Sequence, residues 1–595
     1  MRCGQLPAQK PQWFFQPRSN RNGSRNGGDD TAPGLTGLPD ALLRRHGARV
    51  LDPEKAAAVH GFPLPRSTVY RARTLLVPDG VQQDAPKVKA INEVLAGVGM
   101  TLIPAPPQTP PRVRDPDLAR KLAELPRVAT LAPARHNLTP AVVDAWVALQ
   151  ALRAAVTSPR QQKPAKSGLA QTDIEPIALE HLLVGSAIDG SPIGHGGGGL
   201  TGGTNGGGVT GPGSTDSYVY SGGDTRSPVA LLLDPPYRRT AAKCQDRYGR
   251  RPVVAVLDTG VRAHPWLDVE RQAGGYNLDP ADNGDGFMSV DLGIQQAILD
   301  EGKKAEAKGD KPRQLIRHPW DTPVTSDPLV GELDSDSGHC TFISGIVRQV
   351  APDARVLAVR IMHSDGTIYE GDLLCALRHL AIRIAQAEAG HPEQMVDVIS
   401  LSLGYFDETR HDANFTSGLW DVIELLLGQG VIVVAAAGNY STSRRFYPAA
   451  FATKTPPGGL PLISVGALNP NGSKAIFSDG GHWITAWASG AAVVSTLPVD
   501  VNASRSPELR LRAHPDNPLP PGISLPASRE SLDPDDYSGA FGVWSGTSFS
   551  APLLAARITR ALMEGAENGL KLTAYGPQDT LNRALSALKS MNWAG

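Results

Sequence analysis

The sequence predicts an α/β protein with a mostly parallel central sheet flanked by helices, preceded by a small α+β module and a glycine-rich linker. After residue 250, continuous apolar runs of strand length alternate with helical patterns. Strands this apolar are buried on both faces, which is typical of parallel sheets. Before residue 160, alternating strand and helix patterns predict the smaller module.

Residues 1–65 form the first predicted region, which we expect to be largely disordered or irregular. Arg, Gly, Pro and Asn dominate residues 18–28, and a mild helical pattern follows around residues 41–60. The only apolar cluster near the start is Trp13-Phe14-Phe15, whereas a secretory signal needs about 7–15 apolar residues. We therefore expect no signal peptide, no membrane partner and, by default, a cytoplasmic protein.

Residues 66–157 form the predicted α+β module. Strands are expected at 69–77, 101–103 and 127–131, with one helix from Val88 to Val98 and another that begins at Thr139-Pro140. A linker over 158–245 follows, with glycine-rich residues 194–213 that are expected to stay flexible. A phosphate-binding loop is disfavoured there because no Gly-Lys-Ser/Thr follows.

Residues 246–595 form the last predicted region, a larger α/β domain with insertions near 280–335 and 498–540, which the resemblance described below identifies as catalytic. Apolar strands are expected at 252–257, 356–359, 396–401, 431–436 and 462–465, and helices at 371–388 and 418–428. Functional sites of parallel sheets gather at the carboxyl ends of the strands. Asp258 and Asn439 both fall at such ends.

Composition excludes several other functions. The 595 residues carry 58 basic and 59 acidic side chains, so no basic excess indicates a nucleic-acid partner. The four cysteines are Cys3, Cys244, Cys340 and Cys375, which are too few and too scattered for a disulfide framework or a zinc site. Cys340 and Cys375 are more simply interpreted as free thiols, although a bond between them stays open.

Three residues next to glycines indicate nucleophilic catalysis. Asp258 precedes Thr259-Gly260, His339 follows Gly338, and Ser548 lies two residues after Gly546. A serine hydroxyl is a good nucleophile only when a base takes its proton and a third group orients that base. The chain order Asp, His, Ser differs from the orders in chymotrypsin and in the α/β-hydrolases.

These motifs resemble those of the subtilisin-like (subtilase) serine peptidases. Asp258-Thr259-Gly260, Gly338-His339-Cys340-Thr341 and Gly546-Thr547-Ser548 with Ala551-Pro552 are similar to the Asp, His and Ser motifs of that family. The resemblance covers about residues 250–565. Cys340, Phe342 and Phe549 depart from the usual Gly, His and Met, and all three leave the reacting groups in place.

The resemblance implies a serine-type endopeptidase that hydrolyses peptide bonds of polypeptide substrates through a Ser-His-Asp triad and an acyl-enzyme intermediate. It implies an oxyanion hole made by Asn439 and Ser548, the latter through its backbone N–H. It also implies substrate-binding residues Ser402, Leu403, Gly404, Ala436, Ala437 and Gly438. Small residues at 436–438 suggest a pocket with room for a large apolar side chain.

Alternatives remain for activity, cofactors and the module. A transpeptidase or macrocyclase would use the same residues, and a non-catalytic scaffold is disfavoured because they are all present. A sedolisin-like enzyme is disfavoured by His339. No cofactor is expected, although Asp279, Asp282, Asp285 and Asp334 leave a structural calcium site open. The module is either a pro-region that docks on the catalytic cleft or a permanent accessory domain.

Overall fold

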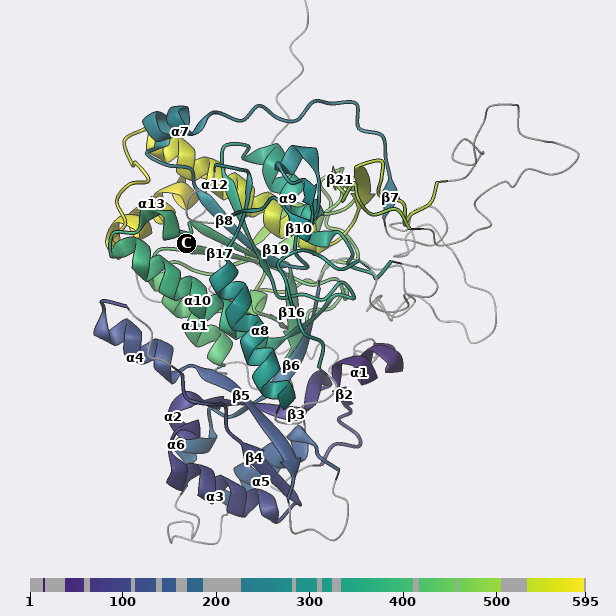
Figure 1. Ribbon diagram of the computed structural model, residues 1–595, viewed down its shortest axis with the longest axis vertical. Coiled ribbons are helices and arrows are strands. Elements are labelled where there is room, and N and C mark those ends of the chain that lie inside the picture. Colours follow the sequence, from purple (N-terminus) through teal and green to yellow (C-terminus); the bar gives the residue numbers. More distant parts are fainter. Residues whose placement is uncertain are drawn as a thin grey trace, which may run out of the picture.

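The computed structural model describes residues 14–15, 38–57, 65–108, 113–134, 142–156, 169–185, 226–280, 285–307, 313–323, 333–409, 417–455, 459–503 and 532–592. The predicted glycine-rich segment 194–213, the helix start at Thr139-Pro140, and Cys3 all lie outside these residues. Figure 1 shows the module (purple to blue) beneath the larger catalytic region (teal to yellow).

A central parallel sheet organises the catalytic region. Its strand order is β1-β20-β19-β17-β15-β8-β13-β12-β11, and the pairs from β20 to β11 are parallel. The strands are β1 (Phe14–Phe15), β8 (Val253–Asp258), β11 (Asp279–Pro280), β12 (Met288–Val290), β13 (Arg355–Arg360), β15 (Val398–Leu401), β17 (Ile432–Ala436), β19 (Ile463–Leu468) and β20 (Ala486–Ser489). All five strands predicted in this region are confirmed, within about three residues at each end.

Helices cover both faces of this sheet, as the apolar strands require. On one face lie α9 (His339–Val350) and α12 (Thr547–Glu567), and on the other lie α8 (Leu292–Ala307), α10 (Glu370–Glu388) and α11 (Gly418–Gly428) (Figure 1). Further elements at the rim are α7 (Ala241–Tyr248), α13 (Pro577–Ser590), β7 (Ser227–Pro228), β9 (Arg271–Gln272), β10 (Gly275–Tyr276), β21 (Val493–Thr496) and β22 (Phe541–Trp544). The predicted α/β class is confirmed.

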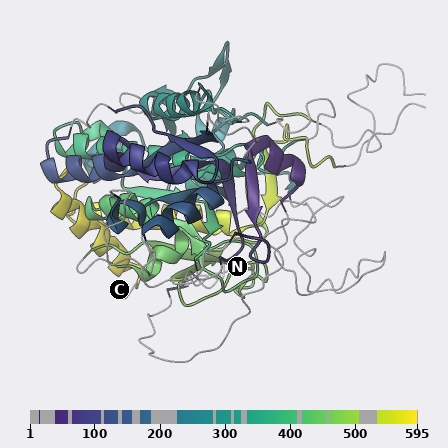
Figure 2. The same ribbon diagram turned by 90° about the horizontal axis from the view of Figure 1, so that it is seen from below.

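The module has its own sheet and its own hydrophobic core. Its strands are β2 (Ala48–Leu51), β3 (Thr68–Pro78), β4 (Met100–Ile103), β5 (Pro126–Pro133) and β6 (Ala178–Gly185), and its helices are α1 (Asp40–His46), α2 (Asp79–Gln82), α3 (Ala85–Ala96), α4 (Pro116–Glu124), α5 (Ala145–Val156) and α6 (Gln171–Ile174). Its core contains Leu75, Ile91, Leu131, Trp146 and Leu179. Seen from below, its purple and blue helices lie in front of the rest of the molecule (Figure 2).

Both predicted boundaries of the module need correction. Residues 1–65 were expected to be irregular, yet α1 and β2 are formed there, and β2 pairs with β3. The linker was expected to begin at residue 158, yet β6 pairs with β3 and places Leu179 in the module core. A strand joins a sheet through backbone hydrogen bonds to distant residues, which local composition does not reveal.

The last strand of the module also pairs with the catalytic region. β6 lies between β14 (Thr367–Tyr369) and β16 (Leu403–Phe406) and is antiparallel to both, and β16 continues to β18 (Phe446–Tyr447). In register, Ile368 is opposite Leu183, Gly404 is opposite Val184, and Leu403 is opposite Gly185. One continuous sheet therefore runs from the module into the catalytic region.

No helix among the described residues is both long enough and apolar enough to cross a lipid bilayer.

Candidate active site

Asp258 is the last residue of the central strand β8 and is fully buried. The chain must turn directly after it: Gly260 has φ +92°, and a Cβ there would lie 2.4 Å from the Pro319 carbonyl oxygen. Only glycine fits that position without strain. The Thr259 N–H donates to Asp258 Oδ1 at 2.8 Å, which helps to orient the carboxylate.

His339 begins helix α9 and meets this carboxylate. Gly338 precedes the helix with φ +79°, and its N–H donates to Asp321 Oδ2 at 2.7 Å. His339 Nδ1 lies 2.9 Å from both carboxylate oxygens of Asp258. Since Nδ1–H donates there, the neutral ring carries its lone pair on Nε2, the atom that a general base uses.

The surroundings of His339 raise the pKa of its imidazole. Complete burial by itself would lower the pKa, because it disfavours the charged ring. The negative charge of Asp258, its hydrogen bond, and the charges of Asp336 and Asp321 outweigh that effect, so the pKa lies above its ordinary value of 6.5. The protonated form of this imidazole is thereby stabilised.

Ser548 is the second residue of α12, where the backbone N–H groups have no acceptor within the helix. Its Oγ donates to the Ser402 carbonyl oxygen at 3.4 Å. His339 Nε2 has no hydrogen-bond partner among the described residues. The hydrogen bond between serine and histidine is thus not formed in this arrangement, and catalysis requires it to form.

Pro552, in the second turn of α12, affects the backbone carbonyl of Ser548. Proline lacks an N–H, so the Ser548 carbonyl loses the acceptor role that it would have in an uninterrupted helix. The Ser402 hydroxyl donates to this carbonyl at 2.9 Å instead. Ser402 and Ser548 are therefore joined by two hydrogen bonds that run in opposite directions.

Asn439 lies three residues beyond β17 and contacts the same helix. Its Oδ1 accepts from the N–H and from the hydroxyl of Thr547, both at 2.9 Å. Both bonds use the carbonyl oxygen, so they hold the Oδ1 end of this side chain against the start of α12. The structure thus places Asn439 next to the helix start that carries Ser548, the two residues predicted to form an oxyanion hole.

The predicted substrate-binding residues form two facing segments. Ser402, Leu403 and Gly404 lie at β15–β16, and Ala436, Ala437 and Gly438 lie at the end of β17. The buried Phe446 side chain lies against both segments. A Cβ at Gly404 would lie 2.3 Å from the Phe446 ring, and one at Gly438 would lie 3.1 Å from it.

The reacting groups are sealed from solvent. Asp258, His339 and Ser548 are each 0 % exposed, and Asn439 is 7 % exposed. β6 of the module runs beside Leu403 and Gly404, one and two residues from Ser402. A substrate cannot reach Ser548 while the chain keeps this arrangement.

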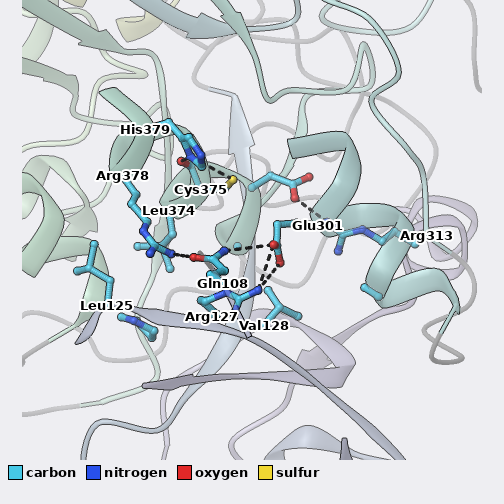
Figure 3. A pocket seen from close by; sticks show the side chains of 14 residues that line it. Gln108, Leu125, Arg127, Val128, Glu301, Arg313, Leu374, Cys375, Arg378 and His379 are labelled. Carbon is cyan, nitrogen blue, oxygen red and sulfur yellow. Dashed lines mark hydrogen bonds and ion pairs between the residues drawn. The ribbon is translucent and has the colours of Figure 1, made fainter. Parts of the chain in front are cut away.

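Charged side chains hold the module against α8 and α10. Arg127 on β5 pairs with Glu301 on α8 at 3.1 Å, and Gln108 lies within 3.3 Å of the same carboxylate (Figure 3). The Arg378 guanidinium on α10 also donates to Gln108. These contacts line a pocket between the module and the catalytic region.

Several residues that support the site were not found by sequence reasoning. Asp321 anchors the start of α9, and burial raises the pKa of its carboxyl to about 6. Phe446 fills the space between the substrate-binding segments. Thr259 accepts a hydrogen bond at Oγ1 from the Cys340 N–H at 3.2 Å. Only Thr259 had a signal in the sequence, its place beside Asp258.

The structure describes two of the four candidate calcium ligands and both cysteines of the possible bond. Asp285 forms an ion pair with Arg251 at 2.6 Å, and Asp334 Oδ2 accepts from the Ser364 hydroxyl at 2.6 Å. Asp282 and the side chain of Asp279 lie outside what the structure describes. Cys340 and Cys375 are free thiols.

The chain belongs to the subtilase family, whose family model matches residues 249–590. The region is similar to the thermophilic serine proteinase of Bacillus sp. (strain AK1), with 31% identity over 28% of this chain and 35% of that protein. It is also similar to thermitase of Thermoactinomyces vulgaris (29% identity; 29% of this chain, 59% of thermitase) and to subtilisin BL of Lederbergia lenta (26%; 42% and 68%). The chain thus spans about a third of the length of the first of these relatives.

The raised pKa of His339 predicts the pH dependence of catalysis. A protonated imidazole cannot accept the serine proton, so activity should rise with pH as His339 loses its proton. We expect the acid-side midpoint of kcat/KM to lie above pH 6.5. Asp336→Asn should move this midpoint downward, because it removes one negative charge that favours the imidazolium. Exposed Asp579→Asn on α13 is the control and should leave it unchanged; a wild-type midpoint at or below 6.5 would contradict this account.

Proposed function

We propose that this chain is a serine endopeptidase that hydrolyses peptide bonds through an acyl-enzyme intermediate. The observation that carries the proposal is the convergence of three separate motifs. His339 Nδ1 lies 2.9 Å from both oxygens of Asp258, while Asn439 and the start of the Ser548 helix are joined by hydrogen bonds. Membership in the subtilase family and the similarity to proteins named as serine proteinases support the same activity.

In this mechanism, Ser548 Oγ attacks the carbonyl carbon of the scissile bond while His339 Nε2 accepts its proton. Asp258 orients the imidazole and stabilises its positive charge. The negative charge on the substrate oxygen is stabilised by the Asn439 amide and the Ser548 N–H. His339 then donates the proton to the leaving amine, the C–N bond breaks, and a water activated by the same histidine releases the acyl group from Ser548.

The same proposal assigns the module the role of a pro-region that blocks the substrate cleft. The pairing of β6 with β14 and β16 supports this role, because residues 402–404 are the segment that resembles a substrate-binding strand. The complete burial of Ser548 supports it as well. β6 then lies where an extended substrate would lie, and release of the module exposes the site.

The specificity that fits this site is for small residues just before the scissile bond. Phe446 lies against both Gly404 and Gly438 and takes the space that a large substrate side chain would need. The sequence directly after β6 is Ser186-Ala187, and both residues are small.

Peptide hydrolysis is tested directly with an unstructured protein as substrate. Wild type should generate fragments with free amino termini, whereas new amide links between fragments would indicate transpeptidation instead; mass spectrometry distinguishes them. Ser548→Ala should abolish both hydrolysis and labelling by a fluorophosphonate probe. Asn439→Ala should lower kcat by about 10²–10³, a range known from subtilisin, because one oxyanion donor is lost. Asn568→Ala, an exposed asparagine beyond α12, should be silent.

Self-cleavage should occur directly after β6. Gly185 is opposite Leu403, the neighbour of Ser402, whose carbonyl oxygen lies 3.4 Å from Ser548 Oγ. Since consecutive Cα atoms are about 3.8 Å apart, the bond that reaches Ser548 lies within the next few residues. We expect a new amino terminus at Ala187 or Ile188, which leaves small Ser186 or Ala187 before the cleaved bond, and terminal sequencing reads it. An intact amino terminus in active wild type would show instead that the module is a permanent domain.

Removing the Phe446 ring should widen specificity. Phe446→Ala is expected to raise kcat/KM for substrates with Phe before the scissile bond, relative to substrates with Ala there, by at least about tenfold. Phe451→Ala is the matched control, since it removes another fully buried ring from the same region and should leave the ratio unchanged. Equal ratios in wild type and Phe446→Ala would rule out Phe446 as the residue that limits the pocket.

A further inference from the structure

A buried cluster of one histidine and several carboxylates lies where the module meets the catalytic region. His181 is on β6 of the module, and Asp407 and Glu408 follow β16 of the catalytic region directly. Glu370 begins α10. Each of these four side chains is at most 5 % exposed.

The His181 ring is held firmly by its neighbours. Its Nδ1 lies 2.7 Å from Glu370 Oε2, which also accepts from the His181 backbone N–H at 3.1 Å. Its Nε2 lies 2.9 Å from Glu408 Oε2. The Tyr405 ring stacks on the imidazole with a centroid distance of 4.2 Å. Both ring nitrogens therefore face carboxylates, and the ring plane is fixed.

Asp407 has one satisfied and one unsatisfied carboxylate oxygen. Oδ1 accepts from the N–H and the hydroxyl of Thr409 at 2.6 and 2.5 Å. Oδ2 is buried and has no hydrogen-bond partner among the described residues. Potential ligand atoms of Asp407, His181 and Glu408 all lie within 4.8 Å of one another. A buried carboxylate oxygen without a partner is unfavourable unless a cation satisfies it.

The cluster also gathers more carboxyl groups than its single imidazole can compensate when they are all ionised. Glu370, Asp407 and Glu408 bring three carboxylates against one imidazole, which compensates for at most one of them even when it is protonated. Arginines also lie close to these carboxyl groups: the charge of Arg153 acts on Glu408, and Arg444 donates to the Asp407 backbone carbonyl at 2.7 Å. Neither satisfies Asp407 Oδ2.

We propose that His181 Nε2, Asp407 and Glu408 bind a divalent transition-metal ion of the zinc type. An imidazole nitrogen with two carboxylate oxygens is a donor set that suits zinc, and a water would complete four-coordination. Glu370 supplies the hydrogen bond at Nδ1 that a ligating histidine usually makes, so that its tautomer leaves the Nε2 lone pair for the metal. Such an ion would satisfy Asp407 Oδ2 and offset the negative charge.

The ion would join two parts of the chain, because one ligand comes from the module and two come from the catalytic region. It would therefore strengthen the contact of β6 with β16. Any effect of this ion on how strongly the module blocks the substrate cleft rests on the proposed function. The metal site itself does not.

Metal binding is tested on the full-length Ser548→Ala chain, which cannot cleave itself, so the result is independent of peptidase activity. After removal of metals with a chelator, the protein is loaded with Zn²⁺, dialysed and analysed for zinc by mass spectrometry. We expect one zinc per chain. Loading with Co²⁺ should produce visible absorption bands that report ligation by the protein.

His181→Gln and Asp407→Asn should each weaken zinc affinity at least about tenfold and abolish the cobalt bands. Asp407→Asn nearly preserves side-chain volume and the contact with Thr409, so it remains informative if His181→Gln fails to fold. His46→Gln is the matched control: His46 is also buried at the module interface and lies 2.9 Å from Asp365, so it should retain one zinc. Absence of stoichiometric zinc in the parent chain, or full retention in folded Asp407→Asn, would overturn the proposal.

Discussion

The backbone pairing of β6 with β14 and β16 is the interaction on which the arrangement of the whole chain depends. It joins the sheet of the module to the rim of the catalytic region, and it brings Val184 and Gly185 beside the residues that adjoin Ser402. The burial of Ser548, the position of His181 among carboxylates from α10 and β16, and the contact between α8 and β5 all accompany that pairing. Because main-chain hydrogen bonds carry it, the pairing depends on extended conformation more than on particular side chains.

The rest of the interface is rich in charge. His46 and Arg45 pair with Asp365 at 2.9 and 3.0 Å, and Arg127 pairs with Glu301. Buried ion pairs contribute little net stability because desolvation offsets their attraction. Removal of one partner, however, leaves a buried unpaired charge, which strongly destabilises the folded state. While such an interface is formed, each charged side chain needs its specific partner. Once the two surfaces separate, water can hydrate the charges on both. That behaviour is consistent with the proposed role of the module as a pro-region that is released.

Much of the catalytic region could be predicted from the sequence, and the reasons are physical. The strands around Val254 and Val433 are apolar on both faces, so their burial in a parallel sheet follows from composition alone. The Asp258, His339 and Ser548 motifs were recognisable because each reactive residue lies beside a glycine that the backbone needs. β6 was not predicted, because Glu180 and His181 interrupt its apolar pattern, and the carboxylates that bind His181 lie about 190 residues or more further along the chain. Phe446 was missed because the space it fills is bounded by segments outside its own sequence neighbourhood.

The strand β6 also has a practical meaning as a template for inhibitor design. Leu182, Leu183, Val184 and Gly185 already present the main-chain groups that β14 and β16 recognise. A short synthetic peptide of this sequence, ending in a small residue that carries an electrophilic carbonyl, would combine that recognition with reversible capture of the serine. If the proposed activity holds, the scaffold for such a ligand is encoded within the chain itself.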